Sequence, residues 1–371
     1  MNILITSPSL DMRRNVNGIS AVVAGIMANS TQRYFPYRLG RHDDQRGGVG
    51  WVFGLLGQLL GFMPFALRHR IDLVHQNLPF DAKGILRESV VTTMARLLGM
   101  PVLLHVHGGA FLMAGCPNPW LRWLASHMLQ RSQVVVVLSE LEREALVRQF
   151  PGINAQVLSN AVAVPAVARE PGPAGTRRRT VLFLGRLHES KGLHDLLAAV
   201  RLLYPRRPFR LVVCGAGPLQ QTLVDGCSAV MGADFEFRGV VAGEDKARAI
   251  ADADIFVLPS RYGEGLPMAL LEAMAAGLVP VVTDDASMKV VVQPGVNGVR
   301  VAKCDPADLA TKLEALLGDD ALMTRLALQA TETVRAGYGI GPYMARLEEL
   351  YASCVLPGRT TGNGDQTPLA P

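Results

Sequence analysis

With 371 residues, of which 49% are hydrophobic and 19% charged, the chain has the composition of a folded globular protein, which excludes a disordered one. Its length exceeds what one hydrophobic core usually organises, so we expect two domains. Residues 1–165 carry 15 Lys and Arg against 9 Asp and Glu, which gives a net charge of +6. Residues 166–371 carry the other 22 Lys and Arg and 23 Asp and Glu, which gives a net charge of −1. Because no nucleic-acid motif accompanies the basic half, we expect an anionic substrate or membrane surface as its partner, and no nucleic acid.

The first half alternates apolar segments of strand length with helical stretches. Its opening, MNILITSPSL, has no basic region ahead of an apolar stretch, so it predicts a buried strand rather than a signal peptide. Strands are predicted at 2–6, 72–75, 101–106 and 133–138, and helices at 18–30, 82–98, 119–131 and 139–149. Continuous apolar strands flanked by helices indicate a parallel sheet covered on both faces.

The segment 51–67, WVFGLLGQLLGFMPFAL, is nearly all apolar and is followed by Arg68 and Arg70. It is short for a membrane span and is interrupted by Gln58 and Pro64. Two interpretations stay open: a helix buried in the core of its domain, or a helix lying in the interface of an anionic membrane. The second would bury Trp51, Phe53, Leu55, Leu56, Leu59, Leu60 and Phe62 in the bilayer.

The second half repeats the pattern and predicts a second doubly wound domain. Strands are predicted at 180–184, 209–214, 235–238, 254–258 and 279–283, and helices at 193–203, 218–230, 244–252 and 267–276. The proline-rich stretch 163–179 has no apolar period and predicts a linker. The expected division is an acceptor-side domain at 1–165, a donor domain at 166–341, a helix at 342–356 that returns to the first domain, and a disordered tail at 357–371.

The five cysteines are scattered, without a CxxC pair or a metal-ligand spacing. Such a set is typical of reduced thiols in a reducing compartment. We therefore expect a cytoplasmic protein, with peripheral contact to the inner face of the cell membrane if 51–67 is interfacial.

The strongest chemical signal is LPSRYGEGLPMALLEAMAAGLVPVV at 258–282. A buried strand ends near Pro259, a loop with two glycines follows, and a helix opens near Pro267, where free N–H groups favour a phosphate. Glu264 in the loop and Glu272 about two turns later could hold sugar hydroxyls at both ends of one ligand. A single Glu is usually a solvated charge, but this pair lies between apolar flanks.

Glu264, seven intervening residues and Glu272, followed by AMAAGLVPVV, resemble the acidic signature of the family-four retaining glycosyltransferases, which have the GT-B fold. The resemblance implies an α/β fold in which two Rossmann-like, doubly wound domains face a central cleft. It also implies that Glu272 holds the ribose hydroxyls of the nucleotide and that Glu264 lies near the transferred sugar. The backbone at Gly265, Leu266 and Pro267 would line the diphosphate, although Pro267 offers no N–H.

Three further segments agree with this family. LFLGRLHESKGL places Arg186 and Lys191 after a strand, where the family uses them on the donor diphosphate. Fixed cations there would stabilise the negative charge that builds on the leaving group. LVVCGAGPL resembles the family's glycine turn and assigns Gly215 and Gly217 to donor binding, although a glycine turn alone is a weak motif. SPSLDMRRNVNGISAVV keeps Gly18, one of two glycines that the family has near the donor phosphate and acceptor.

A histidine ends a strand of the first domain in LLHVHGGAF. Open parallel sheets bind ligands at the carboxyl ends of their strands, and in the family a His at this place contacts the transferred sugar. We assign this role to His107. For His105 and His75 we expect packed or hydrogen-bonded structural roles, which is the usual fate of a lone His in a strand.

The chain departs from the family after VVT at 281–283, with Ala286 and Ser287 in place of a glycine pair and Val290 in place of a glutamate. This departure bears on base or sugar specificity. Asp252 and Asp254 form a D-x-D, a pattern that can hold a divalent metal over a diphosphate, but they precede a strand instead of following one. Asp284 and Asp285 follow a strand, and we do not favour them as a metal site. We expect no metal and no cofactor besides the nucleotide sugar, because the cations of the donor loop replace a divalent ion.

The resemblance implies a retaining hexosyltransferase that moves a sugar from a nucleotide-diphosphate donor to a glycan acceptor, lipid-linked in polysaccharide synthesis. Two alternatives are a sugar-nucleotide epimerase of similar architecture and an inactive partner subunit of a polysaccharide-assembly complex. Release of nucleoside diphosphate only when acceptor is present would exclude the epimerase. Donor binding would exclude the inactive subunit.

Overall fold

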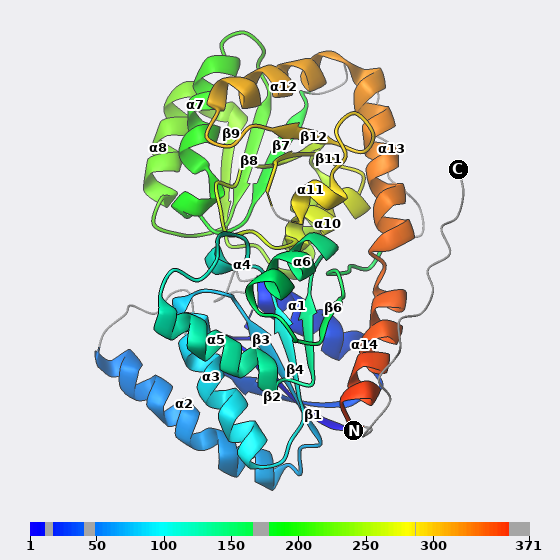
Figure 1. Ribbon diagram of the computed structural model, residues 1–371. Helices are drawn as coiled ribbons and strands as arrows, with labels where there is room; N and C mark the ends of the chain where they lie inside the picture. Colours follow the sequence, from blue (N-terminus) through cyan, green and yellow to red (C-terminus); the bar gives the residue numbers. More distant parts are fainter. Residues whose placement is uncertain (12–17, 41–48, 166–177, 286, 356–371) are drawn as a thin grey trace.

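The computed structural model shows two α/β domains, one above the other, joined along one side (Figure 1). It describes residues 1–11, 18–40, 49–165, 178–285 and 287–355. The predicted tail at 357–371 and most of the predicted linker at 163–179 lie outside these residues.

The first domain is built on a parallel sheet of six strands in the order β2-β1-β3-β4-β5-β6. The strands are β1 (Asn2–Ser7), β2 (Arg33–Arg38), β3 (Leu73–Leu78), β4 (Val102–Val106), β5 (Val134–Val137) and β6 (Ala155–Val157). The helices are α1 (Gly18–Asn29), α2 (Val49–Arg68), α3 (Ala82–Leu97), α4 (Ala110–Ala114), α5 (Pro119–Arg131) and α6 (Glu140–Gln149). Helices cover both faces of this sheet, so its central strands are fully buried.

The second domain repeats this plan, with six parallel strands in the order β12-β11-β10-β7-β8-β9. The strands are β7 (Thr180–Leu184), β8 (Arg210–Cys214), β9 (Phe235–Gly239), β10 (Ile255–Leu258), β11 (Val279–Thr283) and β12 (Val299–Val301). The helices are η1 (Glu189–Lys191, 3₁₀), α7 (Leu193–Leu203), α8 (Gln220–Met231), η2 (Gly232–Asp234, 3₁₀), α9 (Gly243–Ala251), α10 (Met268–Ala275), α11 (Met288–Val291), α12 (Pro306–Gly318) and α13 (Asp320–Gly337). The last helix, α14 (Ile340–Val355), returns to the first domain. The predicted pair of doubly wound parallel domains is therefore confirmed.

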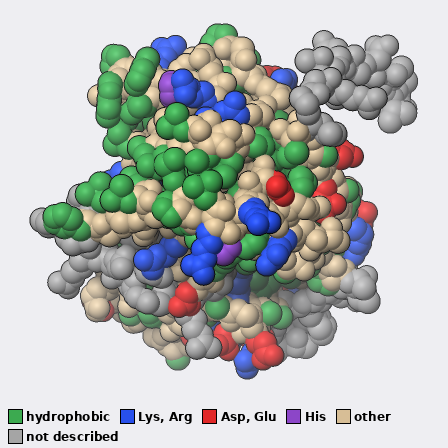
Figure 2. Space-filling view, turned by 90° about the horizontal axis from the view of Figure 1, so that it is seen from below, with side chains coloured by type: hydrophobic (Ala, Val, Ile, Leu, Met, Phe, Trp, Pro, Cys, Tyr) green, Lys and Arg blue, Asp and Glu red, His purple; other side chains and the backbone are tan. Residues whose placement is uncertain are grey.

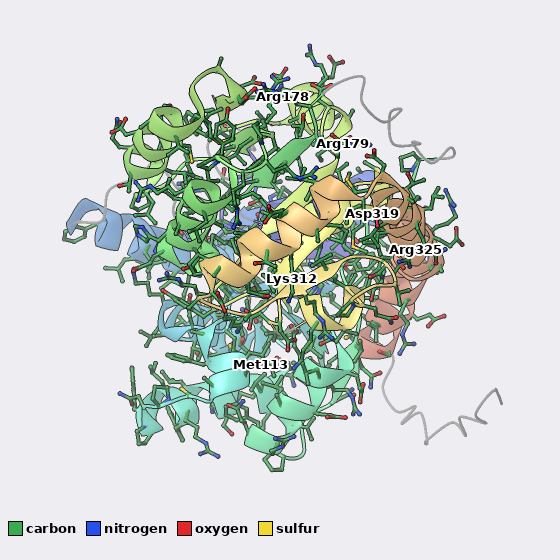
Figure 3. The ribbon with its side chains drawn as sticks, turned by 90° about the horizontal axis from the view of Figure 1, so that it is seen from above. Met113, Arg178, Arg179, Lys312, Asp319 and Arg325 are labelled. Carbon is green, nitrogen blue, oxygen red and sulfur yellow. The ribbon has the colours of Figure 1, made fainter. Side chains whose placement is uncertain are left out.

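The charged surface of the second domain is largely neutralised by local ion pairs. Figure 3 looks down on this domain and shows α12 with Lys312 crossing the view. Lys312 lies 2.9 Å from Asp308, one helical turn earlier, and Arg179 pairs with Asp320 at the start of α13. Asp319 caps α13 by accepting from the backbone N–H of Leu322 at 2.8 Å. Acidic and basic side chains are therefore interspersed on this part of the second domain.

Helix α2 contains the apolar segment 51–67. It is neither wholly buried in the core nor wholly exposed for contact with a membrane. One face packs on the first domain, where Phe62 and Ala66 are fully buried. The other face leaves Phe53 and Leu60 exposed. The expectation that Phe62 would enter a bilayer is therefore wrong, because that ring lies inside the protein. The side chain of Trp51 lies outside the described residues.

The chain crosses between the domains twice, at adjacent points. The Val162 N–H donates to the carbonyl of Tyr338 at 2.9 Å, and the Ile340 N–H donates to the carbonyl of Val162 at 3.1 Å. After the second crossing, α14 lies against the first sheet, where Leu347 and Tyr351 are fully buried among side chains of β1, β3 and β4. The last helix thus completes the core of the domain in which the chain began.

Candidate functional site

The two domains meet where the carboxyl ends of their parallel strands face each other. Strand β4 runs into His107 and Gly108, and strand β10 runs into the loop that carries Glu264 and Gly265. A Cβ atom on Gly108 would lie 2.6 Å from the backbone nitrogen of Gly265. The backbones of the two domains can approach this closely only because both positions are glycine.

Glu264 is buried at this junction, with 7% of its surface exposed. Its carboxylate forms an ion pair with Lys191 at the end of η1 and accepts a hydrogen bond of 2.5 Å from the hydroxyl of Ser260. A buried carboxylate is tolerated because it has a cation and a donor as partners. The structure therefore brings together Glu264 and Lys191, which lie 73 residues apart in the sequence.

Arg186 lies between β7 and η1, and its side chain is exposed. Its loop is held by the glycine turn after β8, because a Cβ atom on Gly215 would lie 1.8 Å from the carbonyl oxygen of Gly185. Gly217 makes a similar approach of 2.4 Å to the carbonyl oxygen of Leu187. In this structure the two glycines support the loop that carries the cations, while their assignment to donor binding stays a prediction.

Glu272 lies on α10, which begins at Met268 directly after Pro267. Its carboxylate accepts a hydrogen bond of 2.6 Å from the ammonium group of Lys246 on α9. Lys246 could not be predicted from the sequence, because nothing in GEDKARA relates it to Glu272 by spacing. Each acid of the E-x7-E signature thus has its own lysine: Lys191 for Glu264 and Lys246 for Glu272.

His107 is half-buried, and its Nε2 atom lies 2.7 Å from Oδ1 of Asn77 on β3. Burial lowers the pKa of His107 to about 3, so its imidazole is neutral at physiological pH. Behind it, Nε2 of His75 lies 3.3 Å from Nδ1 of His105, and Nδ1 of His75 lies 2.7 Å from the hydroxyl of Tyr351. His75 and His105 are fully buried and hydrogen-bonded to each other.

Two further predicted residues lie beside this junction. Leu266 is buried, and its carbonyl oxygen accepts a hydrogen bond of 2.6 Å from the side-chain amide of Asn160 in the first domain. Gly18 begins α1, and no atom of the described residues lies within 4 Å of the place its Cβ would occupy. Helix α1 contacts α10 of the second domain, so Gly18 belongs to a helix that faces the donor side.

A second contact between the domains involves Ser287, one of the positions at which the sequence departs from the family. Its Oγ atom lies 2.6 Å from Oε1 of Glu142 and 2.9 Å from Oγ of Ser139, both at the start of α6. Oε2 of Glu142 accepts from the backbone N–H of Leu138 at 3.0 Å. Burial raises the pKa of Glu142 to about 7 despite these hydrogen bonds. The departure therefore adds an interdomain hydrogen bond.

The acids considered as metal ligands have other partners. Asp284 lies 3.2 Å from Arg300, and Asp285 lies 2.5 Å from Lys303. Asp254 accepts from the backbone N–H of Thr180 at 2.8 Å, at the amino end of the sheet and away from the junction. Within the described residues, no group of three or more His, Cys, Asp or Glu side chains is placed to hold a metal ion.

Two family models match the chain, one on each domain. Residues 21–161 match a glycosyl transferase 4-like domain, and residues 178–319 match the glycosyl transferases group 1. A phosphatidyl-myo-inositol mannosyltransferase from Mycobacterium leprae is 33% identical over 204 residues, which cover 54% of this chain and 54% of that protein. The chain thus spans about half the length of the curated relatives it matches.

Solved structures share the whole fold at low sequence identity. Sucrose-phosphate synthase from Thermosynechococcus elongatus superposes with a TM-score of 0.78 at 18% identity, covering 95% of this chain and 98% of that one. HepE from Anabaena, solved in complex with UDP and glucose, gives a TM-score of 0.75 at 16% identity, covering 95% and 100%. The predicted GT-B architecture is confirmed.

Proposed function

This chain belongs to the glycosyl transferases that combine a 4-like first domain with a group 1 second domain, and from this premise we propose that it is a retaining hexosyltransferase. Its donor is a nucleotide-diphosphate sugar, bound by the second domain. Its acceptor is a lipid-linked glycan of polysaccharide synthesis, met by the first domain. Similarity to a mannosyltransferase of a phosphatidylinositol and to an enzyme solved with UDP and glucose supports these two classes of substrate.

The chemistry needs no covalent attachment to the protein. The acceptor hydroxyl attacks the anomeric carbon from the face that the diphosphate leaves, the bond from carbon to the phosphate oxygen breaks, and a phosphate oxygen takes the hydroxyl proton. The protein's contribution is to orient the reactants and to stabilise the leaving diphosphate. Arg186 and Lys191 stabilise that charge, and Glu264 and His107 hold the sugar.

One observation carries the proposal: the close approach of Gly108 to Gly265 brings His107 and Glu264, from different domains, to the same junction. A thermal-shift screen against UDP-, GDP- and ADP-sugars tests it, because a bound donor stabilises the folded state. We expect one class of donor to raise Tm, and acceptor to be required for release of nucleoside diphosphate. No shift with any sugar nucleotide would contradict the proposal, and conversion of the sugar without release would indicate an epimerase.

Replacing Glu272 by Ala should weaken the binding of nucleoside diphosphate itself, because the ribose hydroxyls lose a charged acceptor. We expect a loss of about 1.5–3 kcal/mol, measured by titration calorimetry with the free diphosphate. Glu264→Ala should leave this binding largely intact and reduce turnover. Glu332→Ala, which removes an exposed acid of the same domain paired with Arg335, is the matched control. Equal affinity of wild type and Glu272→Ala would rule out the ribose assignment.

Catalysis should be independent of divalent metal, because cations of the protein stabilise the leaving group. We expect turnover to survive an excess of EDTA within the error of the assay. Loss of activity in EDTA, with recovery on adding magnesium or manganese, would overturn this expectation. That result would favour Asp284 and Asp285 as metal ligands, and their ion pairs with Arg300 and Lys303 would then have to break.

The lipid-linked acceptor is supported by an exposed apolar strip on the first domain. On α2, Phe53, Leu56, Leu60 and Leu67 follow one another at helical spacing, and Phe53 and Leu60 are 68% and 74% exposed. The adjoining helices α3 and α5 add the exposed side chains of Leu86, Val90, Leu97, Trp120 and Trp123. Figure 2, seen from below, shows hydrophobic side chains spread across this side of the molecule, with Lys and Arg side chains beside them.

The exposed charged side chains of these three helices are all basic. Their exposed charged side chains are those of Arg68, Lys83, Arg96, Arg122 and Arg131. The single acid within α2, α3 and α5 is Glu88, which is 1% exposed and paired with Arg87. This arrangement differs from the paired charges of α12 and α13. It complements an anionic lipid surface, to which each basic residue contributes about 1 kcal/mol.

We therefore place the strip against the cytoplasmic leaflet of an anionic membrane, with the donor domain in the cytoplasm. Within the described residues, no helix is both long enough and apolar enough to cross a bilayer. Contact by an interfacial helix needs only the exposed face of α2, while its other face stays in the protein core.

Co-sedimentation with liposomes tests this contact. We expect the wild type to bind vesicles that contain anionic phospholipid at low salt, and to bind less as salt screens the basic residues. The double variant Phe53→Glu, Leu60→Glu should lose most of this binding and keep its Tm, because both side chains are exposed. Leu202→Glu, Leu328→Glu makes the same change on exposed residues of the second domain and is the control. Failure of the wild type to bind at low salt would favour a soluble acceptor.

A further inference from the structure

Asn77 is the residue that holds the imidazole of His107. It lies one residue before the end of β3, beside β4, is 3% exposed, and its Oδ1 atom lies 2.7 Å from Nε2 of His107. The proposed function uses His107 and leaves Asn77 without a role.

The orientation of the Asn77 amide is fixed by its other hydrogen bonds. Its Nδ2 group donates to the backbone carbonyl of Thr6 at 2.8 Å, and its backbone N–H donates to the hydroxyl of Thr6 at 2.9 Å. Turning the amide over would set Oδ1 against the carbonyl oxygen of Thr6, two acceptors without a proton between them. Oδ1 therefore faces His107 as an acceptor, and Nε2 of His107 must carry the proton.

A neutral imidazole protonated on Nε2 has a lone pair on Nδ1. Within the described residues, Nδ1 of His107 makes no hydrogen bond, and it is not among the buried polar atoms that lack a partner. That atom is thus without a hydrogen-bond partner among the described residues, and it belongs to the residue directly before Gly108 at the junction.

We propose that Asn77 is a positioning residue that fixes the Nε2–H tautomer of His107, so that the site presents Nδ1 to the ligand as an acceptor only. The group recognised there is then a hydrogen-bond donor, such as a sugar hydroxyl, and not a phosphate or carboxylate oxygen. This inference rests on the proposed function in taking His107 as a sugar contact. It adds the residue that decides which kind of sugar atom His107 accepts.

Within the described residues, no charged side chain forms a hydrogen bond with either ring nitrogen of His107. The titratable side chains near His107 include His105 on the same strand, whose ring centroid lies 4.1 Å away, and His75 on β3. Across the junction lies the carboxylate of Glu264, which is bonded to Lys191 and Ser260. Burial lowers the pKa of His75 to about 3 and that of His105 well below its ordinary value, so both are neutral. The hydrogen bond to Asn77 is therefore the interaction that distinguishes the two nitrogens of His107.

Nitrogen-15 NMR of histidine-labelled protein reads the tautomer directly, without any substrate. We expect His107, identified by the signals that disappear in His107→Gln, to show a protonated Nε2 and an unprotonated Nδ1 between about pH 6 and about pH 8. Asn77→Leu should produce a mixture of tautomers. A wild-type His107 protonated on Nδ1 would overturn the inference, even if the proposed transferase activity is established.

The pH dependence of turnover separates this role from a merely structural one. In Asn77→Asp, a carboxylate in place of the amide should raise the pKa of His107, and the imidazolium would present a donor from Nδ1. We expect kcat/KM to fall by about tenfold per pH unit below the raised pKa, while the wild-type profile stays flat. Asn29→Asp, the same change at an exposed position, is the control. Parallel profiles for Asn77→Asp and wild type would contradict the positioning role. If no sugar nucleotide is turned over, the proposed function fails and the NMR result still decides the tautomer.

Discussion

Arg186→Ala should lower kcat by about 100- to 1000-fold, the cost of removing one donor that stabilises a developing negative charge. The guanidinium lies in the loop after β7, ahead of the Lys191–Glu264 pair, where the leaving diphosphate would accumulate charge. Because the Arg186 side chain is exposed, its loss should change the free energy of unfolding by no more than about 0.5 kcal/mol. Steady-state kinetics with the donor found by thermal shift, together with Tm, measure both effects.

Arg248→Ala, which removes an exposed arginine of α9 in the same domain, is the control for Arg186→Ala. It should leave kcat unchanged. Lys191→Ala is a less clean probe, because it would also leave the buried carboxylate of Glu264 without its cation. A kcat for Arg186→Ala within a factor of two of wild type would remove Arg186 from the site.

Gly265→Ala should lower kcat/KM by about 100-fold by holding the domains apart, since misplacement of reacting groups by about 1 Å has a cost of this size. The new methyl group would lie 2.8 Å from Leu138 and 3.1 Å from the backbone nitrogen of Gly108, both in the first domain. The Leu138 side chain can turn away, but the backbone cannot. Gly265 does not have a positive φ, so alanine costs little within its own loop.

Small-angle scattering should show a larger radius of gyration for Gly265→Ala than for wild type, with an unchanged Tm. Gly337→Ala is the control, because Gly337 also lacks a positive φ and no atom in the part of the chain that the structure describes lies within 4 Å of its added Cβ. If the Gly265→Ala protein keeps wild-type dimensions and kinetics, the close approach of the two glycines does not govern the reaction.

Most of the fold follows from local pattern, and the strands that escaped prediction lie at the edges of the sheets. Helices α12 and α13 were not predicted either. The central strands are continuous apolar runs, which is why their positions are nearly correct. β2 reads RYFPYR, with arginines at both ends and a proline inside, and it pairs with β1 alone. β6 and β12 have three residues each and also pair with one neighbour. An edge strand needs no apolar run, because one of its sides is not covered.

In the candidate site too, residues within one segment can be predicted from the sequence, whereas contacts between distant segments cannot. Spacing within one loop and helix is enough to propose Glu264 and Glu272, because both lie in a single segment. Their partners Lys191 and Lys246 come from other elements, and only the folded chain shows which lysine meets which acid. Asn77 carries no motif at all. Its importance comes from β3 lying next to β4, a neighbour relation that the sequence does not encode locally.

Because the chain crosses between the domains twice, near Val162 and near Tyr338, cleavage of one peptide bond would not separate the two domains. If a protease opened the chain between residues 166 and 177, the second domain would remain covalently attached to α14. That helix keeps Leu347 and Tyr351 inside the core of the first domain. The nicked protein would run as two fragments in denaturing gels yet migrate as one particle in native conditions. Pulling the halves apart would require extracting a helix from a core, which is equivalent to unfolding the first domain.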